Sequence, residues 1–214
     1  MGKHDIIDNR NDKLVDHINR ILPTAEMAKI AVGYFFLSGF EAMADKIDGM
    51  KKIRILIGNT TSRETIEQIS EGYKRLDLAI AAEEKEQYLT RSERTARTRN
   101  TAQNIQRTME LMDQTDEGES LVKNFVRMIE EKRLKVRIYT KGRLHAKAYI
   151  FDYGKIFDEK GKPIERHEKG IAIVGSSNLT LSGVTHNTEL NVLVQGNDNH
   201  TELVNWFEGL WKES

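Results

Sequence analysis

Short apolar runs, separated by segments with helical periodicity, constrain the fold of this chain more than any other feature. An apolar run of roughly four to eight residues bounded by polar residues is typical of a buried strand. After the first run, Phe40, Met43, Ala44 and Ile47 recur at the spacing of one helix face. The runs are 29–36, 53–57, 136–139, 144–151, 171–174 and 190–194. This order predicts an α/β fold that opens with a β-α-β unit.

Further helical patterns surround these runs. Residues 11–22 and 121–129 repeat apolar side chains at helical spacing, and a longer helical pattern runs from Thr61 to Ile80. The last helix places several large apolar side chains on one face, which we assign to the core. They are Leu203, Trp206, Phe207, Leu210 and Trp211.

The length of the chain fits a single domain covering residues 1–214. Between residues 83 and 119 hydrophobicity falls while charge and threonine content rise, which predicts a helical insertion or arm within that domain. The charged stretch 152–170 predicts a long solvated connection. We expect the runs 136–139, 144–151 and 171–174 to form adjacent strands.

Charge and composition exclude several classes of protein. The chain has 33 Lys and Arg against 33 Asp and Glu, so any site for a polyanion must be a local cationic one. The apolar run around residues 30–40 is too short to span a membrane, and the polar N-terminus lacks a signal-peptide pattern. With no cysteine, the chain has no disulfide and no thiolate zinc site. We therefore expect a cytoplasmic protein without membrane association.

The sequence around His145 and Lys147 is the most informative local pattern. In a strand, residues two apart point to the same side, so these two side chains would project together. Two cationic groups on one side of a buried strand are unfavourable without an anion, and phosphate is the obvious candidate. Asp152 has the opposite parity at the strand's end, and we expect a structural role for it. A strand His-x-Lys pattern alone is often coincidental.

A second pattern follows the apolar strand 171–174. Gly175 and Ser176 allow a sharp turn, and the Ser176 hydroxyl and Asn178 amide offer neutral donors to an oxyanion. Glu189, at the start of the last strand, could hold an imidazole. A Gly-Ser-Ser-Asn turn by itself is usually only a turn or a helix cap, so the order of the patterns carries the argument.

Together these residues resemble the signature of the phospholipase D superfamily, HxKxxxxD followed after the next strand by GSxN. The match comprises His145, Lys147, Asp152, Gly175, Ser176 and Asn178, with Glu189 downstream. The strand at 30–36 within the β-α-β opening is similar to phospholipase D-like domains attached to helicases. The resemblance implies a mixed β-sheet flanked by helices, and a possible helicase partner. The connection between Asp152 and Gly175 is longer than in compact members of the family.

The resemblance also implies a mechanism. One imidazole attacks phosphorus to give a phosphohistidine, and a second imidazole protonates the leaving oxygen. His145 is the predicted nucleophile, with Lys147, Asn178 and more weakly Ser176 stabilising the oxyanion. Glu189 would orient His145.

Only one copy of the motif is present, so the second imidazole is expected from another subunit of a homodimer. The His-x-Lys at His167 and Lys169 lies in a charged loop without a matching GSxN turn, and we interpret it as chance. His4, His17, His186 and His200 are expected to be ordinary surface histidines. The scheme needs no metal and no cofactor, and the sequence has no HExxH pattern and no Walker lysine loop.

Basic residues near the motif favour nucleic acid as the substrate, with DNA ahead of RNA. Lys141 and Arg143 precede His145 closely, and Arg91, Arg94 and Arg97 could track phosphates from the arm. A charge run is often only a solvated helix face, and Tyr139 and Tyr149 could stack bases or belong to the core.

Two alternatives remain. The first is a dimerising DNA-binding module of a larger helicase-like protein with little activity alone. The second, a lipid phosphodiesterase, is disfavoured because no amphipathic membrane helix is evident.

Overall fold

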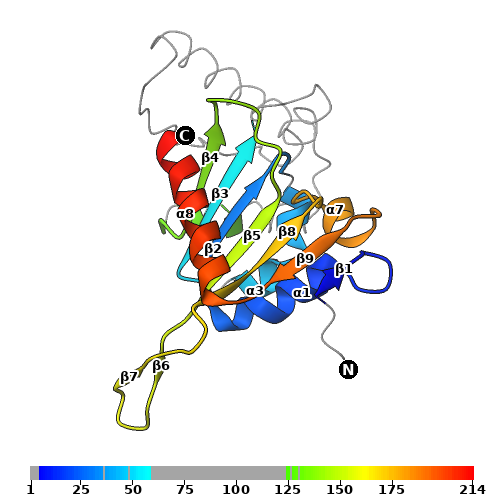
Figure 1. Ribbon diagram of the computed structural model, residues 1–214. Coiled ribbons are helices and arrows are strands. Elements are labelled where there is room, and N and C mark those ends of the chain that lie inside the picture. The colour runs from blue at the N-terminus through cyan, green and yellow to red at the C-terminus, as the bar shows by residue number, and fades with distance from the viewer. Residues whose placement is uncertain (1–4, 36, 48, 59–123, 126, 130) are drawn as a thin grey trace.

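The computed structural model describes residues 5–35, 37–47, 49–58, 124–125, 127–129 and 131–214. Within these residues, the main sheet has seven strands in the order β1-β9-β8-β5-β2-β3-β4 (Figure 1). The strands are β1 (Ile6–Ile7), β2 (Ala25–Val32), β3 (Lys52–Gly58), β4 (Leu134–Tyr139), β5 (Ala148–Tyr153), β8 (Gly170–Gly175) and β9 (Asn191–Val194).

The sheet is mixed, as predicted. Strands β2, β3 and β4 are parallel, whereas β5 is antiparallel to both of its neighbours, β2 and β8. Parallel neighbours require a crossover, and the helices α2 (Leu37–Glu41) and α3 (Ala44–Ile47) supply it between β2 and β3. The β-α-β opening is therefore confirmed, although β2 begins four residues earlier than the predicted run.

One prediction about neighbouring strands was wrong. β5 and β8 are adjacent, but β4 lies at the sheet edge beside β3 and does not contact β5 as a ladder partner. The physical reason is that β5 runs opposite to the parallel set and pairs with the free side of β2. Apolar runs indicate which segments are strands, but they do not encode which strands pair.

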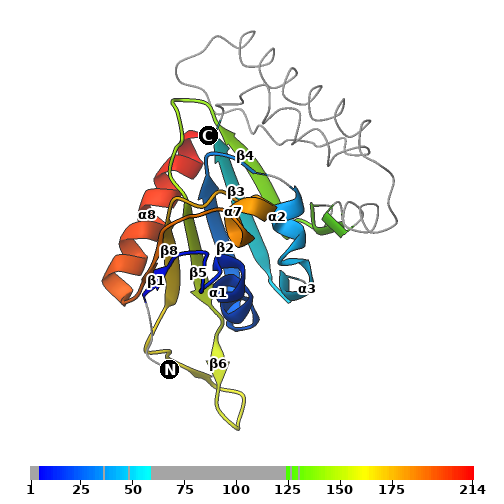
Figure 2. The same ribbon diagram turned by 90° about the vertical axis from the view of Figure 1, so that its right-hand side faces the viewer.

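Helices cover both faces of the sheet. The long helix α8 (Asn197–Glu213) lies on one face, and α1 (Leu14–Ile21), α2, α3 and α7 (Leu181–Thr185) lie on the other (Figure 2). A short 3-10 helix (Leu22–Thr24) joins α1 to β2. The core beneath α8 contains Leu56, Ile150, Phe207 and Trp211, and the larger core on the opposite face contains Ile30, Ile55, Phe151 and Ile173.

The predicted apolar face of α8 needs one correction. Phe207 and Trp211, four residues apart, are buried and stack with 5.6 Å between ring centroids. Trp206 is 37% exposed, because a helix turns by about 100° per residue and carries this side chain away from the sheet. Assigning Trp206 to the core was wrong.

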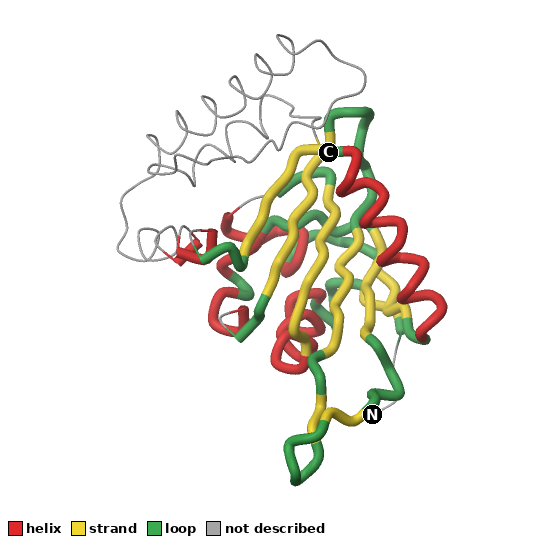
Figure 3. The backbone as a smooth tube through the Cα atoms, turned by 90° about the vertical axis from the view of Figure 1, so that its left-hand side faces the viewer, coloured by secondary structure: helices red, strands yellow, loops and turns green. Residues whose placement is uncertain are grey.

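The segment after β5 also differs from the prediction of a simple connection. It contains a small antiparallel hairpin, β6 (Ile156–Phe157) paired with β7 (Pro163–Ile164), whose four residues are all exposed. The hairpin projects beyond the sheet from the end where β5 finishes (Figure 3). Its two-residue strands are too short to stand out from the surrounding charged sequence.

Several predicted segments lie outside the described residues. These are the long helix 61–80, the arm 83–119 and part of the helix 121–129. Of the last segment, Phe125 and Met128 are buried, and the Phe125 ring meets Phe40 edge-on with 5.1 Å between centroids.

Candidate active site

The predicted motif residues converge at one end of the sheet. There the carboxyl end of β2, the start of β5, the end of β8 and the start of β9 lie side by side. Ala31 of β2 pairs with Ala148 of β5, which pairs with Val174 of β8, and Gly175 pairs with Asn191. Residues just outside this row of partners therefore come from four different segments and can act on one ligand.

The segment before β5 reaches this end by crossing close to the ends of β2 and β3. A Cβ atom on Gly58 would lie 2.7 Å from the Leu144 carbonyl oxygen and 2.9 Å from that of Gly33. Contacts this short exclude any side chain at position 58 unless the backbone moves. The glycine that ends β3 thus lets His145 sit directly over the strand ends.

His145 and Lys147 lie together as the strand parity predicted. The strand itself begins only at Ala148, but the Gly175 N–H donates to the Lys147 carbonyl at 3.1 Å and continues the ladder by one residue. The Lys147 Nζ lies 3.2 Å from the His145 Nδ1 and donates to the His145 carbonyl oxygen at 2.8 Å. His145 is exposed, so its ring can meet a ligand from solvent.

Lys147 is held in an unusual environment for an amine. Its residue is 6% exposed, and burial lowers its pKa, while the Glu189 carboxylate acts in the opposite direction. Among the described residues no carboxylate lies within ion-pair distance of its Nζ. A buried ammonium without a direct counter-ion is stabilised by a bound anion.

Asn178 is oriented by the turn that follows β2. The Tyr34 N–H donates to the Asn178 Oδ1 at 2.9 Å, which leaves the Nδ2 group as the donor for an oxyanion. The same two loops meet again one residue further on, where Phe35 forms a parallel bridge with Leu179. The loops after β2 and β8 therefore fix the amide jointly.

Ser176 and Glu189 contact each other directly. The Ser176 hydroxyl donates to the Glu189 carboxylate, and the same hydroxyl oxygen accepts the Leu190 N–H at 3.0 Å. The His145 ring contacts the Lys147 Nζ, so an orienting role of Glu189 toward His145 stays a prediction. Ser176 likewise stays a predicted oxyanion donor.

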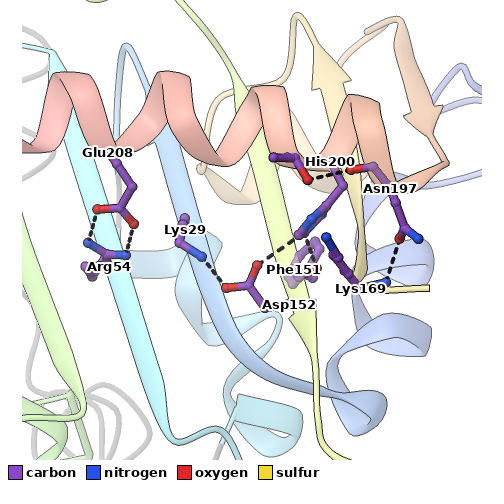
Figure 4. Close-up of polar contacts among 9 residues, drawn as sticks. Lys29, Arg54, Phe151, Asp152, Lys169, Asn197, His200 and Glu208 are labelled. Atoms are coloured by element: carbon purple, nitrogen blue, oxygen red, sulfur yellow. Dashed lines mark hydrogen bonds and ion pairs between the residues drawn. The ribbon is translucent and has the colours of Figure 1, made fainter. Parts of the chain in front are cut away.

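Asp152 lies away from this site, at the opposite end of β5. Its carboxylate pairs with the Lys29 ammonium, and its Oδ1 lies 3.2 Å from the His200 Nε2 (Figure 4). The same ring nitrogen lies 3.2 Å from the Phe151 carbonyl oxygen. The cluster is covered by α8, and a structural role for Asp152 agrees with this position.

His200 corrects one expectation. It was interpreted as a surface histidine, but it is buried, because the first turn of α8 directs it onto the sheet beside Asp152. Its partner lies 48 positions earlier in the chain, so sequence spacing gives no sign of the contact.

The predicted phosphate-contacting residues are only partly described. Lys141 and Arg143 are exposed in the loop between β4 and β5 that leads to His145. Arg91, Arg94 and Arg97 lie outside the described residues. Of the two tyrosines, Tyr149 is fully buried and belongs to the core, whereas Tyr139 is half-buried and donates its hydroxyl to Glu213 at 3.0 Å.

Comparison with protein families identifies the chain's relatives. A family model described as the phospholipase D-like domain of cardiolipin synthase matches residues 18–211, nearly the whole chain. The chain belongs to the phospholipase D superfamily. Membership supports phosphodiester chemistry for this domain.

One solved structure shows the same fold at low sequence identity. Nuc from Salmonella typhimurium, a phospholipase D family member, is 11% identical, with a TM-score of 0.50 over 97% of this chain and 93% of that one. NucT from Helicobacter pylori is also 11% identical, with a TM-score of 0.48 over 99% of this chain and 96% of NucT.

Polyphosphate kinase from Porphyromonas gingivalis is 14% identical, with a TM-score of 0.47 over 98% of this chain, which spans 26% of the kinase. No curated protein sequence matches this chain. None of the helices in the described ranges is long and apolar enough to cross a membrane.

Sequence reasoning missed several contacts around this candidate site. Tyr34 and Gly58 approach it through the backbone, and Tyr149 and Asn191 support it from the core. The apolar Gly-Tyr-Phe end of the first run could have pointed to Tyr34. The other three contacts depend on strand order, which the sequence does not show.

Proposed function

We propose that this phospholipase D-like domain hydrolyses phosphodiester bonds of nucleic acid through a phosphohistidine intermediate. One observation carries the proposal: a buried ammonium, Lys147, lies against an exposed imidazole, His145, at the end of the sheet that also presents Asn178. This arrangement combines a nucleophile with donors for the oxygens of a phosphate.

The chemistry proceeds in two displacements. A ring nitrogen of His145 attacks phosphorus in line, forming a P–N bond as the bond to the leaving oxygen breaks. A second imidazole donates a proton to that oxygen, then accepts one from the water that attacks phosphorus and breaks the P–N bond. Lys147 and Asn178 stabilise the negative charge on the non-bridging oxygens during both steps.

The second imidazole is proposed to be the partner subunit's His145 in a homodimer. Among the described histidines, His200 is buried against Asp152, and His167 follows the projecting hairpin. A two-fold axis beside the exposed His145 ring would bring two identical half-sites over one phosphorus atom. The dimer therefore completes the site.

Charge near the site favours nucleic acid over lipid. Lys141 and Arg143 are exposed within four residues of His145, where they can contact phosphates on either side of the scissile bond. The family model carries the name of a lipid synthase, so the family does not decide the substrate. Substrate assays must compare both classes.

The test is a nuclease assay with a chelator present. Wild type should cleave single- or double-stranded DNA in EDTA, and His145→Ala should reduce kcat by at least about 10²-fold, as expected for a positioned proton-transfer group. His167→Ala is the matched control, because it removes the imidazole of the other His-x-Lys pattern and should leave the rate unchanged. Equal rates for wild type and His145→Ala would reject the proposal.

A mixing experiment tests the composite site. Wild type and His145→Ala chains are refolded together in varied ratios, and only dimers with two intact histidines should be active. Activity should then fall as the square of the wild-type fraction. A linear fall would show that each chain works alone.

The alternative of a DNA-binding module has its own signature. It predicts DNA affinity that survives His145→Ala and falls with added salt, without cleavage by either protein. A helicase partner, which this alternative includes, remains a prediction from the sequence resemblance. Turnover of phosphatidyl substrates in micelles, without cleavage of DNA, would instead favour the lipid alternative.

A further inference from the structure

A buried polar side chain holds the turn that carries Asn178. Asn191, the first residue of β9, is 0% exposed. Its Oδ1 accepts the Ser177 N–H at 3.3 Å, and its Nδ2 donates to the Ser177 hydroxyl oxygen at 2.9 Å. Both ends of one carboxamide are thus used by a single residue of the turn.

A second side chain holds the same residue from the neighbouring strand. The Tyr149 hydroxyl donates to the Ser177 carbonyl oxygen at 2.9 Å, and both residues are fully buried. Tyr149 lies two residues after Lys147 and points to the same side of the sheet. The N–H, hydroxyl and carbonyl groups of Ser177 are therefore all fixed by Asn191 and Tyr149.

The turn cannot shift toward Asn191 either. A Cβ atom on Gly175 would collide with the Asn191 Oδ1 and with the Leu190 carbonyl oxygen. Because this space is already filled, the backbone at Gly175 rests directly on the Asn191 side chain. Ser177 is drawn into the core while its neighbours Ser176 and Asn178 retain access to the site end of the sheet.

We propose that Asn191, supported by Tyr149, is a positioning residue that fixes the turn 175–178 and so aims the Asn178 amide at the phosphate. The expected effect of Asn191 on catalysis rests on the proposed function, whereas its role in fixing the turn does not. Neither side chain contacts the substrate; they act through Ser177.

Loosening the turn should slow the chemical step of the reaction. The Asn178 side chain is held through its Oδ1 contact with the Tyr34 N–H, so a loosened turn displaces its Nδ2 donor. Misplacing a catalytic group by about 1 Å can reduce the rate by ~10²-fold. A donor that matters in the transition state affects kcat, whereas KM depends on contacts made by the bound substrate.

The experiment compares Asn191→Ala and Tyr149→Phe with the control Tyr153→Phe. Tyr153 lies at the far end of β5, half-buried beneath the Arg166 guanidinium. Tyr153→Phe therefore removes the same hydroxyl group as Tyr149→Phe, but away from the turn. Amide hydrogen exchange of residues 175–180 reports the turn directly. Cleavage kinetics, measured where circular dichroism shows each variant to be folded, report kcat and KM.

Faster exchange of the turn in Tyr149→Phe and Asn191→Ala, with kcat lowered by about tenfold or more at unchanged KM, would support the proposal. Unchanged exchange, equal effects in Tyr153→Phe, or a loosened turn with wild-type kcat would overturn it. If Asn191→Ala does not fold, the exchange and kinetic data of Tyr149→Phe alone test the proposal. An inactive wild type would reject the proposed function, while the exchange data would still judge the positioning role.

Discussion

The ion pair beneath α8 gives a quantitative test of the structure. Asp152 binds the Lys29 ammonium and faces His200, and Lys29 is only 3% exposed (Figure 4). Asp152→Asn keeps the shape of the side chain but leaves Lys29 buried opposite a neutral amide. Removing one partner of a buried pair costs about 3–5 kcal/mol.

The expected cost lies near the lower end of that range. The Glu208 carboxylate also lies in the field of Lys29 and compensates part of the lost charge, so we expect the free energy of unfolding to fall by about 3 kcal/mol. With a urea dependence of roughly 2 kcal/mol per molar, the unfolding midpoint should drop by about 1.5 M. The assay is urea unfolding followed by circular dichroism.

The double variant Lys29→Met with Asp152→Asn provides the control. Removing both charges abolishes the unpaired ammonium, so the double variant should be more stable than Asp152→Asn by about 1 kcal/mol or more. An unchanged midpoint in Asp152→Asn, or purely additive effects, would refute the pairing.

The same variants test the role of Asp152. Five residues of strand, about 16 Å, separate it from Lys147, so folded Asp152→Asn should keep its cleavage activity. Loss of activity in the folded variant would assign Asp152 to the chemistry.

Three further predictions concern pH, packing and backbone approach. Burial raises the pKa of Asp152, but hydrogen bonds from His200 and Lys29 outweigh it, and the Arg54 hydrogen bond lowers the pKa of Glu208. Both pKa values lie below their ordinary 3.8 and 4.5. Their stabilisation is therefore present above about pH 4.5 and lost as pH falls through the folded pKa values; a urea midpoint that stays constant down to pH 3 would contradict this. Trp211→Ala should cost about 3–5 kcal/mol in urea unfolding, because it removes a buried ring stacked under the Arg137 guanidinium, 4.5 Å from the ring centroid. Gly58→Ala should lower both stability and cleavage rate by displacing Leu144. A variant with wild-type thermal unfolding and cleavage rate would show that the backbone at Leu144 does not pack tightly against position 58.

Local features of the fold and site were predictable. The positions of the longer strands followed from apolar runs, whereas the two-residue strands β1, β6 and β7 were not predicted. The shared direction of His145 and Lys147 followed from strand parity. Both depend on residues close in the chain, so a single sequence suffices to predict them. The same reasoning placed Ser176 and Asn178 in a turn after a strand.

Contacts between distant segments could not be predicted in this way. Three such contacts join residues far apart in sequence. β5 inserts between β2 and β8, Tyr34 holds Asn178, and His200 pairs with Asp152. The exposed Trp206 shows the same limit, because helical periodicity marks an apolar stripe but not how much of it the sheet covers.

The sequence by itself determined the chemical groups of the candidate site and the strands that flank them, since motif spacing and alternation are local properties of the chain. Only the tertiary structure decided that Asp152 pairs with Lys29 and His200 and that Asn191 and Tyr149 support the Asn178 turn. Those outcomes depend on strand order and burial, because a hydrogen bond or ion pair forms wherever packing brings its partners together, whatever their separation along the chain.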